Sequence, residues 1–546
     1  MSEKMRKRIA VLLSALVLAG ILCACGEPVM EEEEEPIEFD VSDTVSGETL
    51  TAGSAADNAF TLCIDNSKSR NPITTKSTLN QTVGGLVYDL LFEVDENFNV
   101  SSRILSDWYM SETGTWVLTP REDIPMHDGT MLSVDDIVYS ISRVYSQGAT
   151  YYQQRMGRVY SSAYNGVVYI STDSPRGLQL TRMAVPIIKE GSILEDMPIG
   201  SGPYMYDQED LTRLNKFEQY ENAELLPFDT VWLREYTGME SMISDYESGR
   251  IDLVVNDPTS IYNMGYGGKN EKRDFATTNM HYLGFNNESD FFCYEQFRHA
   301  LNWIIDREGI VESALDGNGT ASALPIHPNS AQFDATYNNN LLYDPARCLA
   351  ELEKLGCRDL DGDGELEFTL SGSKVDIRIE FLVCADTASK VLAARKIAAD
   401  MESIGIPVHL RELSWEQYKE ILTTGKLGKD EVKFDMYYAE TAIAPDWDTR
   451  DLFAKVKADE NVTNLNFGRW VDAEAEDVVE KFLEANDETR EEARNAMLDV
   501  LTQKSLFLPV CFEKREVITH LGVIGGITPN QYDVFHNITN WKTYLD

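Results

Sequence analysis

The sequence predicts an α/β protein in which parallel strands alternate with helices. Three segments rich in apolar residues, at 375–383, 406–413 and 433–440, are separated by two segments of helical character. Strands that alternate with helices in this way form a parallel sheet with right-handed connections. The chain has 546 residues, which is enough for two or three lobes with sizeable cores.

Each element of this unit has its own signal. Strict alternation of apolar and charged residues in 375–383 predicts a single half-buried strand. The helix that follows is predicted over 388–402. Ser414 and Gln417 have the spacing of a capping box, which predicts a second helix over 414–422.

Three more helices are predicted outside this unit, over 133–145, 295–311 and 344–356. The first begins with Ser133 as a cap and then places its apolar side chains on one face. The third begins with Asp344 followed by a proline, the residue that favours the first helical position.

The first 24 residues predict a lipoprotein signal peptide. Basic residues precede the apolar run 9–22, which is too short for an ordinary membrane span. Leu22-Cys23-Ala24-Cys25 resembles the bacterial lipobox, which implies acylation of Cys25 and removal of residues 1–24. Ordinary secretory cleavage after Ala24, with Cys25 uninvolved, is the alternative. No later apolar run is long enough to span a bilayer.

Residues 25–57 predict a disordered acidic tether. The five consecutive glutamates at 31–35 repel one another, and the segment has too few large apolar side chains to form a core. The whole chain has a formal net charge of −43, which disfavours nucleic acid and anionic lipid headgroups and suits cationic ligands. Solubility outside the cell explains the same charge without any ligand. Six scattered cysteines follow Cys25 without a CxxC pair, so we do not expect a metal cluster.

Four stretches carry a resemblance to a known family. Residues 105–144 contain a tryptophan, the sequence His-Asp-Gly-Thr and a capped helix, and residues 198–204 form the turn PIGSGPY. Residues 282–311 combine a strand with a helix that carries the pattern Arg-x-Ala-Leu-x-x-x-x-Asp-Arg, and ALPIHP follows at 323–328. Together these motifs resemble the extracellular solute-binding proteins of the peptide-and-nickel type, family five, over about residues 60–546.

The resemblance implies a periplasmic-binding-protein-like fold, in which two lobes close on a solute in the cleft between them by hinge motion. The hinge crossings are expected near 283–287 and 508–512. The implied division of the chain is a signal peptide (1–24), a tether (25–57), lobe I (58–285) with an extra subdomain at about 81–194, lobe II (286–507) and a return to lobe I (508–546).

The loop after the third predicted strand is where we expect ligand contact, through Asp446, Trp447 and Asp448. Open α/β sheets bind ligands beyond the carboxyl ends of their strands. The resemblance implies that an aspartate of this loop holds the α-amino group of a peptide. A carboxylate suits a cationic amine, and Trp447 offers an apolar or cation–π wall. The alternative is that Asp448 or Thr449 caps a helix that begins near Arg450 and that Trp447 belongs to the core.

Two asparagines are further candidates. Asn286, at the end of the predicted crossing strand, can offer its amide to a ligand or to a hydrogen bond of the hinge. Asn71 precedes a proline in an early loop where the family usually has Leu-Asp-Pro. This departure leaves the contacts of the first lobe open.

Metal sites have little support in the sequence. Asp359, Asp361 and Asp363 have the spacing of a calcium loop, but Leu370 stands where a bidentate glutamate belongs. An acidic turn is therefore the competing interpretation. The seven histidines are dispersed and form no pair at helical spacing, so nothing favours a nickel chelate.

We therefore expect a substrate-binding lipoprotein of an ABC importer that captures oligopeptides outside the membrane and delivers them to a permease. It is expected to be a monomer without a cofactor. The alternatives are another solute, such as an oligosaccharide or a nickel chelate, and a peptide-sensing receptor. Enzyme chemistry is not expected, because G-x-S-x-G and H-E-x-x-H are absent and His127-Asp128-Gly129 predicts a tight structural turn.

Overall fold

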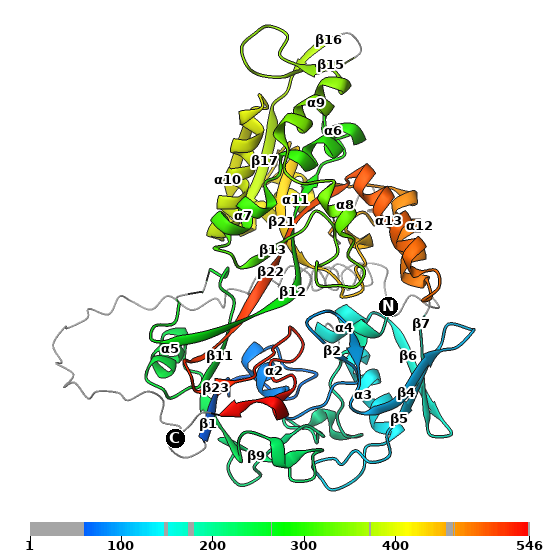
Figure 1. Cartoon of the computed structure of the whole chain (residues 1–546), viewed down its shortest axis with the longest axis vertical. Coiled ribbons are helices and arrows are strands. Elements are labelled where there is room, and N and C mark those ends of the chain that lie inside the picture. Colours follow the sequence, from blue (N-terminus) through cyan, green and yellow to red (C-terminus); the bar gives the residue numbers. More distant parts are fainter. Residues whose placement is uncertain are drawn as a thin grey trace, which may run out of the picture.

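The computed structural model describes residues 59–146, 151–172, 179–261, 263, 265–370, 373–454, 462 and 465–543. The predicted signal peptide, the tether and Cys25 lie outside these residues. Within them, no helix combines the length and the apolar character that a membrane crossing needs. A lower and an upper lobe are joined by two long strands, β12 (Asn270–Phe285) and β22 (Phe507–His520) (Figure 1).

The lower lobe contains the elements β1 (Ala59–Ile64), α2 (Thr78–Gly84), β2 (Glu93–Val94), β3 (Val100–Ser101), β4 (Leu105–Met110), β5 (Trp116–Pro120), α3 (Val134–Ser146), α4 (Tyr151–Met156), β6 (Val159–Tyr164), β7 (Val167–Thr172), β8 (Tyr204–Tyr206), β9 (Arg213–Lys216), β10 (Thr230–Glu235), α5 (Met239–Glu247), β11 (Leu253–Asn256), β23 (Ile524–Gly525) and β24 (Lys542–Thr543). Two four-stranded sheets organise it, with the strand orders β1-β10-β9-β8 and β4-β5-β7-β6. One buried apolar cluster includes both Phe60 and Trp541, so the end of the chain packs in this lobe.

The upper lobe contains the elements α6 (Glu295–Ala300), α7 (Arg307–Ala314), β13 (Gly319–Ala321), α8 (Ala335–Asn339), α9 (Pro345–Leu355), β14 (Cys357–Arg358), β15 (Glu367–Leu370), β16 (Ser373–Asp376), β17 (Ile379–Cys384), α10 (Ala388–Ser403), β18 (Val408–Leu413), α11 (Trp415–Thr424), β19 (Lys426–Leu427), β20 (Asp430–Glu431), β21 (Met436–Ala442), α12 (Ala473–Glu484) and α13 (Arg490–Lys504). Strand β17 runs parallel to both β18 and β21. The predicted parallel unit is thus confirmed.

One seven-stranded sheet extends through both lobes, with the order β11-β22-β12-β21-β17-β18 and with β13 also paired to β22. Strands β12 and β22 are antiparallel, and their register shifts between Ala276 and Met280 and again between His281 and Tyr282. Such irregularities bend and twist a strand pair. The two crossings are therefore continuous strands whose pairing is irregular at residues 276–282.

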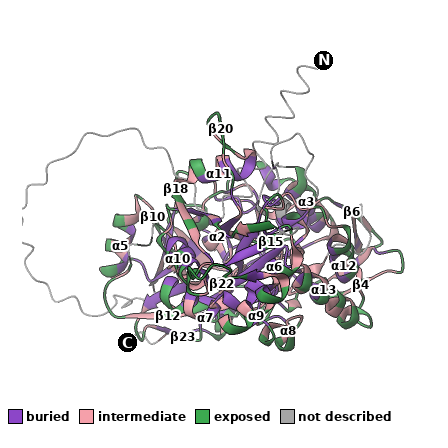
Figure 2. Ribbon diagram, turned by 90° about the horizontal axis from the view of Figure 1, so that it is seen from above, coloured by how far each residue is buried: buried purple, intermediate pink, exposed green. Residues whose placement is uncertain are grey.

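Buried residues follow this shared sheet. Seen from above, the ribbon around β22 is buried, whereas α8 at the periphery has no buried residue and α5 carries both exposed and buried residues (Figure 2). A separate apolar cluster joins the lobes, because Val94, Phe98 and Ala184 of the lower lobe pack with Trp447 and Phe512. The lobes therefore touch through apolar side chains as well as through the two strands.

Two predicted elements are wrong in extent. The predicted strand 375–383 is two strands, β16 and β17, because Ile377 donates its N–H to Leu366 while Ile379 donates to Pro407. The chain thus leaves one sheet and joins another at Arg378. The predicted helix 295–311 is interrupted, since Ile305 has extended geometry and Asp306 caps the new helix α7.

The remaining helix predictions are confirmed. Helix α10 occupies Ala388–Ser403, and α11 begins with the predicted capping box of Ser414 and Gln417. Helix α9 has Asp344 as its cap and ends at Gly356, whose φ of 100° suits a glycine.

Candidate ligand site between the lobes

The loop after β21 brings two aspartates against an arginine of the lower lobe. Arg182 lies in the 3-10 turn Leu180–Met183. Its Nε donates to Asp446 Oδ2 at 2.5 Å, and its Nη2 donates to Asp446 Oδ1 at 2.8 Å and to Asp448 Oδ2 at 2.9 Å. The exposed fractions of the Arg182, Asp446 and Asp448 side chains are 16%, 2% and 14%. Asp446 is therefore buried and Asp448 partly buried, and both are ion-paired across the lobes.

Arg450 completes this charge group. Its Nε donates to Asp448 Oδ1 at 2.9 Å and its Nη2 donates to Asp448 Oδ2 at 2.8 Å. Burial alone would raise the pKa of Asp448, but Arg450 and Arg182 hold that pKa below its ordinary value. Burial disfavours the charge of Arg182, yet the two aspartates raise its pKa above the ordinary value. The ion-paired side chains are two carboxylates and two guanidinium groups, and the carboxylate of Asp451 interacts with the same charges.

The pairing of the two aspartates with two arginines affects how a ligand amine can bind. A ligand ammonium that reaches Asp446 has to take the place of the Arg182 guanidinium. A charged hydrogen bond contributes about 1.5–3 kcal/mol, whereas a buried ion left without its partner costs about 3–5 kcal/mol. The exchange is therefore favourable only if Arg182 moves to where water can solvate it.

Trp447 connects the lobes. Its side chain is 2% exposed, and its Nε1 donates to Ser330 Oγ at 3.1 Å. Its ring lies edge-on to Phe98 of the lower lobe, with 4.9 Å between the ring centres. The φ of Trp447 is +67°, a conformation that a bulky residue adopts only when its surroundings hold it there.

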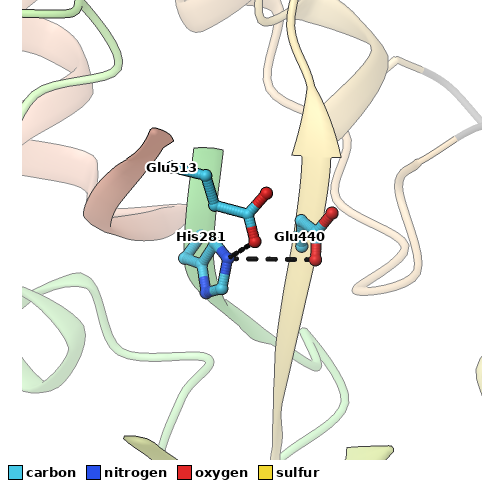
Figure 3. Close-up of side chains that lie close together, drawn as sticks. All are labelled: His281, Glu440 and Glu513. Atoms are coloured by element: carbon cyan, nitrogen blue, oxygen red, sulfur yellow. Dashed lines mark hydrogen bonds and ion pairs between the residues drawn. The ribbon is translucent and has the colours of Figure 1, made fainter. Parts of the chain in front are cut away.

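A second polar group lies where β12, β21 and β22 meet (Figure 3). His281 Nε2 lies 2.7 Å from Glu513 Oε1 and 3.8 Å from Glu440 Oε2. On its other side, His281 Nδ1 lies 2.9 Å from the hydroxyl of Tyr438. The three strands supply one each of His281, Glu440 and Glu513, and all three side chains are buried or nearly so.

Lys390 and Asn279 complete this network. Lys390 of α10 pairs with Glu440 at 2.6 Å, and Asn279 Nδ2 donates to Glu440 and to Glu513 at 2.6 Å each. Burial alone raises the pKa of Glu513, while the charge and hydrogen bond of His281 bring that pKa below its ordinary value. The network thus contains two carboxylates, one ammonium group and one imidazole.

The same residues form a possible set of metal ligands. His281, Glu440 and Glu513 each offer one ligand atom, and these atoms lie within 4.8 Å of one another. Imidazole and carboxylate suit transition metals such as zinc or nickel. However, the Lys390 ammonium already occupies Glu440, and a divalent cation would have to displace it. The carboxylates of this network therefore already have partners within the protein.

The structure does not bring the two candidate asparagines to this site. Asn286 Nδ2 donates to the carbonyl of Phe434, next to the start of β21, whereas the aspartate loop follows its end at Ala442. A strand of seven residues separates these points by about 20 Å. Asn71 is buried in the lower lobe, where its Nδ2 donates to the carbonyls of Ile193 and Glu195.

The carboxylates of the acidic turn at 359–363 also have hydrogen-bond and ion-pair partners within the protein. The carboxylates of Asp359, Asp361 and Asp363 lie within 4.8 Å of one another and are exposed. Asp359 accepts backbone N–H groups at Gly362 and Gly364. Lys374 forms an ion pair with Asp361. These bonds are those of an acidic turn.

Comparison with known proteins decides the family. The sequence profile of the bacterial extracellular solute-binding proteins, family 5 (middle region), matches residues 99–460. The chain belongs to this family. Both the predicted resemblance and the predicted fold class are confirmed.

Three relatives illustrate the range of this family. The oligopeptide-binding protein AppA of Bacillus subtilis is 23% identical over 445 residues, which cover 76% of this chain and 78% of AppA. The glutathione-binding protein GsiB of Escherichia coli O6:K15:H31 is 24% identical over 484 residues, or 84% of this chain and 90% of GsiB. The structure of a nickel ABC transporter protein from Bacillus halodurans shares the fold, with a TM-score of 0.69 and 17% identity over 87% of this chain and 98% of that chain.

Sequence reasoning missed the network of His281, Glu440 and Glu513. These residues are far apart in the chain, and strand pairing alone brings them together. The available signal is a charged or polar residue inside an apolar strand, as in MHYLGF, YYAETA and VCFEKR. Arg182 gives no comparable signal, because an arginine in a short turn is ordinarily a surface residue.

Proposed function

We propose that this chain is the solute-binding component of an ABC importer and that it captures oligopeptides outside the cell membrane. The family is one of extracellular solute-binding proteins. AppA binds oligopeptides, and GsiB binds glutathione, which is itself a tripeptide. The observation that carries the proposal is the ion pairing of Arg182 from the lower lobe with Asp446 and Asp448 from the upper lobe, which places charged groups of both lobes together. The chain acts by binding, as a monomer, and delivers its peptide to a permease.

The site offers groups suited to a peptide. Asp446 and Asp448 can accept hydrogen bonds from an α-amino group once Arg182 has moved, and Trp447 supplies an apolar wall. Main-chain hydrogen bonds give affinity in peptide binders of this kind, while hydrated pockets accept varied side chains.

A metal chelate is the second candidate. The close approach of His281, Glu440 and Glu513 favours it, as does the nickel relative with the same fold. The ion pair of Lys390 with Glu440 speaks against direct coordination by all three side chains.

We also propose that a lipid on Cys25 anchors the protein, with residues 25–57 as its tether. Leu22-Cys23-Ala24-Cys25 after a basic and apolar leader supports this proposal. Two or more acyl chains make a stable anchor, since each buried CH₂ contributes about 0.8 kcal/mol. Cys25→Ser should shift the protein from the membrane fraction to the soluble fraction. Continued membrane fractionation of this variant would contradict the anchor.

Uptake by the producing cells tests the importer function. Cells that lack this chain should lose most of their uptake of isotope-labelled oligopeptides, and a plasmid copy should restore it. Uptake of a labelled free amino acid is the control. Unchanged peptide uptake without the chain would contradict the proposal.

A further inference from the structure

Several contacts join the two lobes away from β12 and β22. Phe98 of the lower lobe packs against Trp447 and His327, with ring centres 4.9 and 5.3 Å apart. Asn329 Nδ2 donates to the carbonyl of Glu96 at 3.1 Å, and Gln179 Nε2 donates to the carbonyl of Leu483 at 2.5 Å. We call this set of contacts, together with the ion pairs of Arg182, the closure interface.

Arg182 supplies the ion pairs of the closure interface. Within the part of the chain that the structure describes, both of its carboxylate partners, Asp446 and Asp448, lie in the upper lobe. Its contact in the lower lobe is the carbonyl of Arg155 at 3.5 Å, which is long for a hydrogen bond. The guanidinium of Arg182 is therefore carried by the lower lobe but paired with carboxylates of the upper lobe.

The two aspartates depend on Arg182 to different degrees. Asp448 also holds Arg450, which lies two residues further along the same loop. Asp446, at 2% exposure, has its ion pair with Arg182, and the charge of Arg490 in the same upper lobe also interacts with it. Opening the lobes would break this ion pair and hydrate both ions, so the pair favours the closed arrangement by the amount that its attraction exceeds the hydration regained.

We propose that Arg182 is the closure latch of this protein and that it also decides which ligands reach Asp446. The guanidinium holds the lobes together by filling the position at the aspartates that an α-amino group would take. A ligand whose cationic amine binds there has to displace Arg182, so the latch selects against free amino termini at this point. The ligand part of this inference rests on the proposed function, whereas the latch itself does not.

Hydrogen–deuterium exchange on the full chain in detergent tests the latch without any ligand. The reporters are residues 94–99 and 327–333, which belong to the closure interface but do not touch Arg182. Arg182→Gln and Asp446→Asn should each accelerate exchange in both reporters by about tenfold or more. Arg182→Lys should give a smaller acceleration because it keeps the charge.

The control is Arg213→Gln, since Arg213 pairs with Asp207 inside the lower lobe at 2.7 Å. It should leave both reporters unchanged. Acceleration confined to residues 179–184 and 444–449, or no acceleration, would overturn the latch. Unchanged exchange in β1 and β17 verifies that a variant is folded. If Arg182→Gln fails this folding check, the exchange of Asp446→Asn tests the latch instead.

Calorimetry with tetraalanine and N-acetyl-tetraalanine tests the ligand part. The unmodified chain should bind the two peptides with affinities within about threefold, whereas Arg182→Gln should favour the free amine by about tenfold. A tenfold preference for the free amine already in the unmodified chain would overturn this part. Binding of neither peptide by any variant would count against the proposed peptide function, while the exchange result still decides the latch.

Discussion

Asp533 shows how burial of a single charge sets a dependence on pH. Asp533 is partly buried and lines a cavity of about 350 Å³ in the lower lobe, together with Asp89 and Glu93. Burial raises the pKa of Asp533 to about 7, and the charges of Glu93 and Asp89 act in the same direction. An unfolded aspartate has a pKa of about 3.9, so the folded chain holds this proton more tightly. Its contribution to stability is therefore full below about pH 4 and is lost as the pH rises to about 7.

Asp533→Asn should stabilise the chain at pH 8 and leave it unchanged near pH 4. The asparagine keeps the oxygen that accepts the Phe535 N–H, but it avoids a buried charge. We expect a gain of about 1–4 kcal/mol at pH 8, with the upper figure set by the full pKa difference. Thermal unfolding at the two pH values measures it. The exposed control Asp123→Asn should give no gain at pH 8, and a gain for Asp533→Asn that is equal at both pH values would contradict the assignment.

At the scale of elements, the crossing strands tolerate no extra atoms at Gly284. In the pairing of β12 with β21, Gly284 lies opposite Tyr437. A Cβ built on Gly284 would lie 2.0 Å from Tyr437 Cζ. Tyr437 is 3% exposed and packs edge-on against Tyr282 and Phe467, so its ring has little room to move.

Gly284→Ala should therefore lower the free energy of unfolding by about 1–3 kcal/mol or more through overpacking. Denaturant unfolding measures the loss, and adding Tyr437→Leu should recover part of it. Gly84→Ala is the matched control, because a Cβ there meets only ordinary contacts at 3.8 and 3.9 Å. Equal effects of Gly284→Ala and Gly84→Ala would show that the crossing strand is looser than this account requires.

Local signals predicted single elements well and their interruptions poorly. The caps at Ser414 and Asp344 are properties of a few neighbouring residues, so sequence suffices to find them. The breaks at Ile305 and Arg378 depend on which partner the backbone finds, and apolar periodicity continues across both of them. Tertiary pairing therefore decides where an element is interrupted, which the spacing of apolar residues does not show.

At the scale of the whole molecule, the family and the two-lobe fold follow from motifs spread along the chain, and the profile match over residues 99–460 confirms them. The aspartate loop was predicted because it follows a parallel strand. Its partner Arg182 lies 264 residues away from Asp446, and no rule of spacing connects them. The network of His281 and Glu513 likewise exists only through strand pairing.

The central claim is that this solute-binding protein carries peptides. Native mass spectrometry of the chain purified from its own host tests that claim most directly, because it weighs whatever the protein has bound in its own setting. We expect a family of added masses that fragment into amino acids and whose spread gives the range of peptide lengths. A single non-peptide mass, or the mass of a metal, would contradict peptide cargo while leaving the fold and the family unchanged.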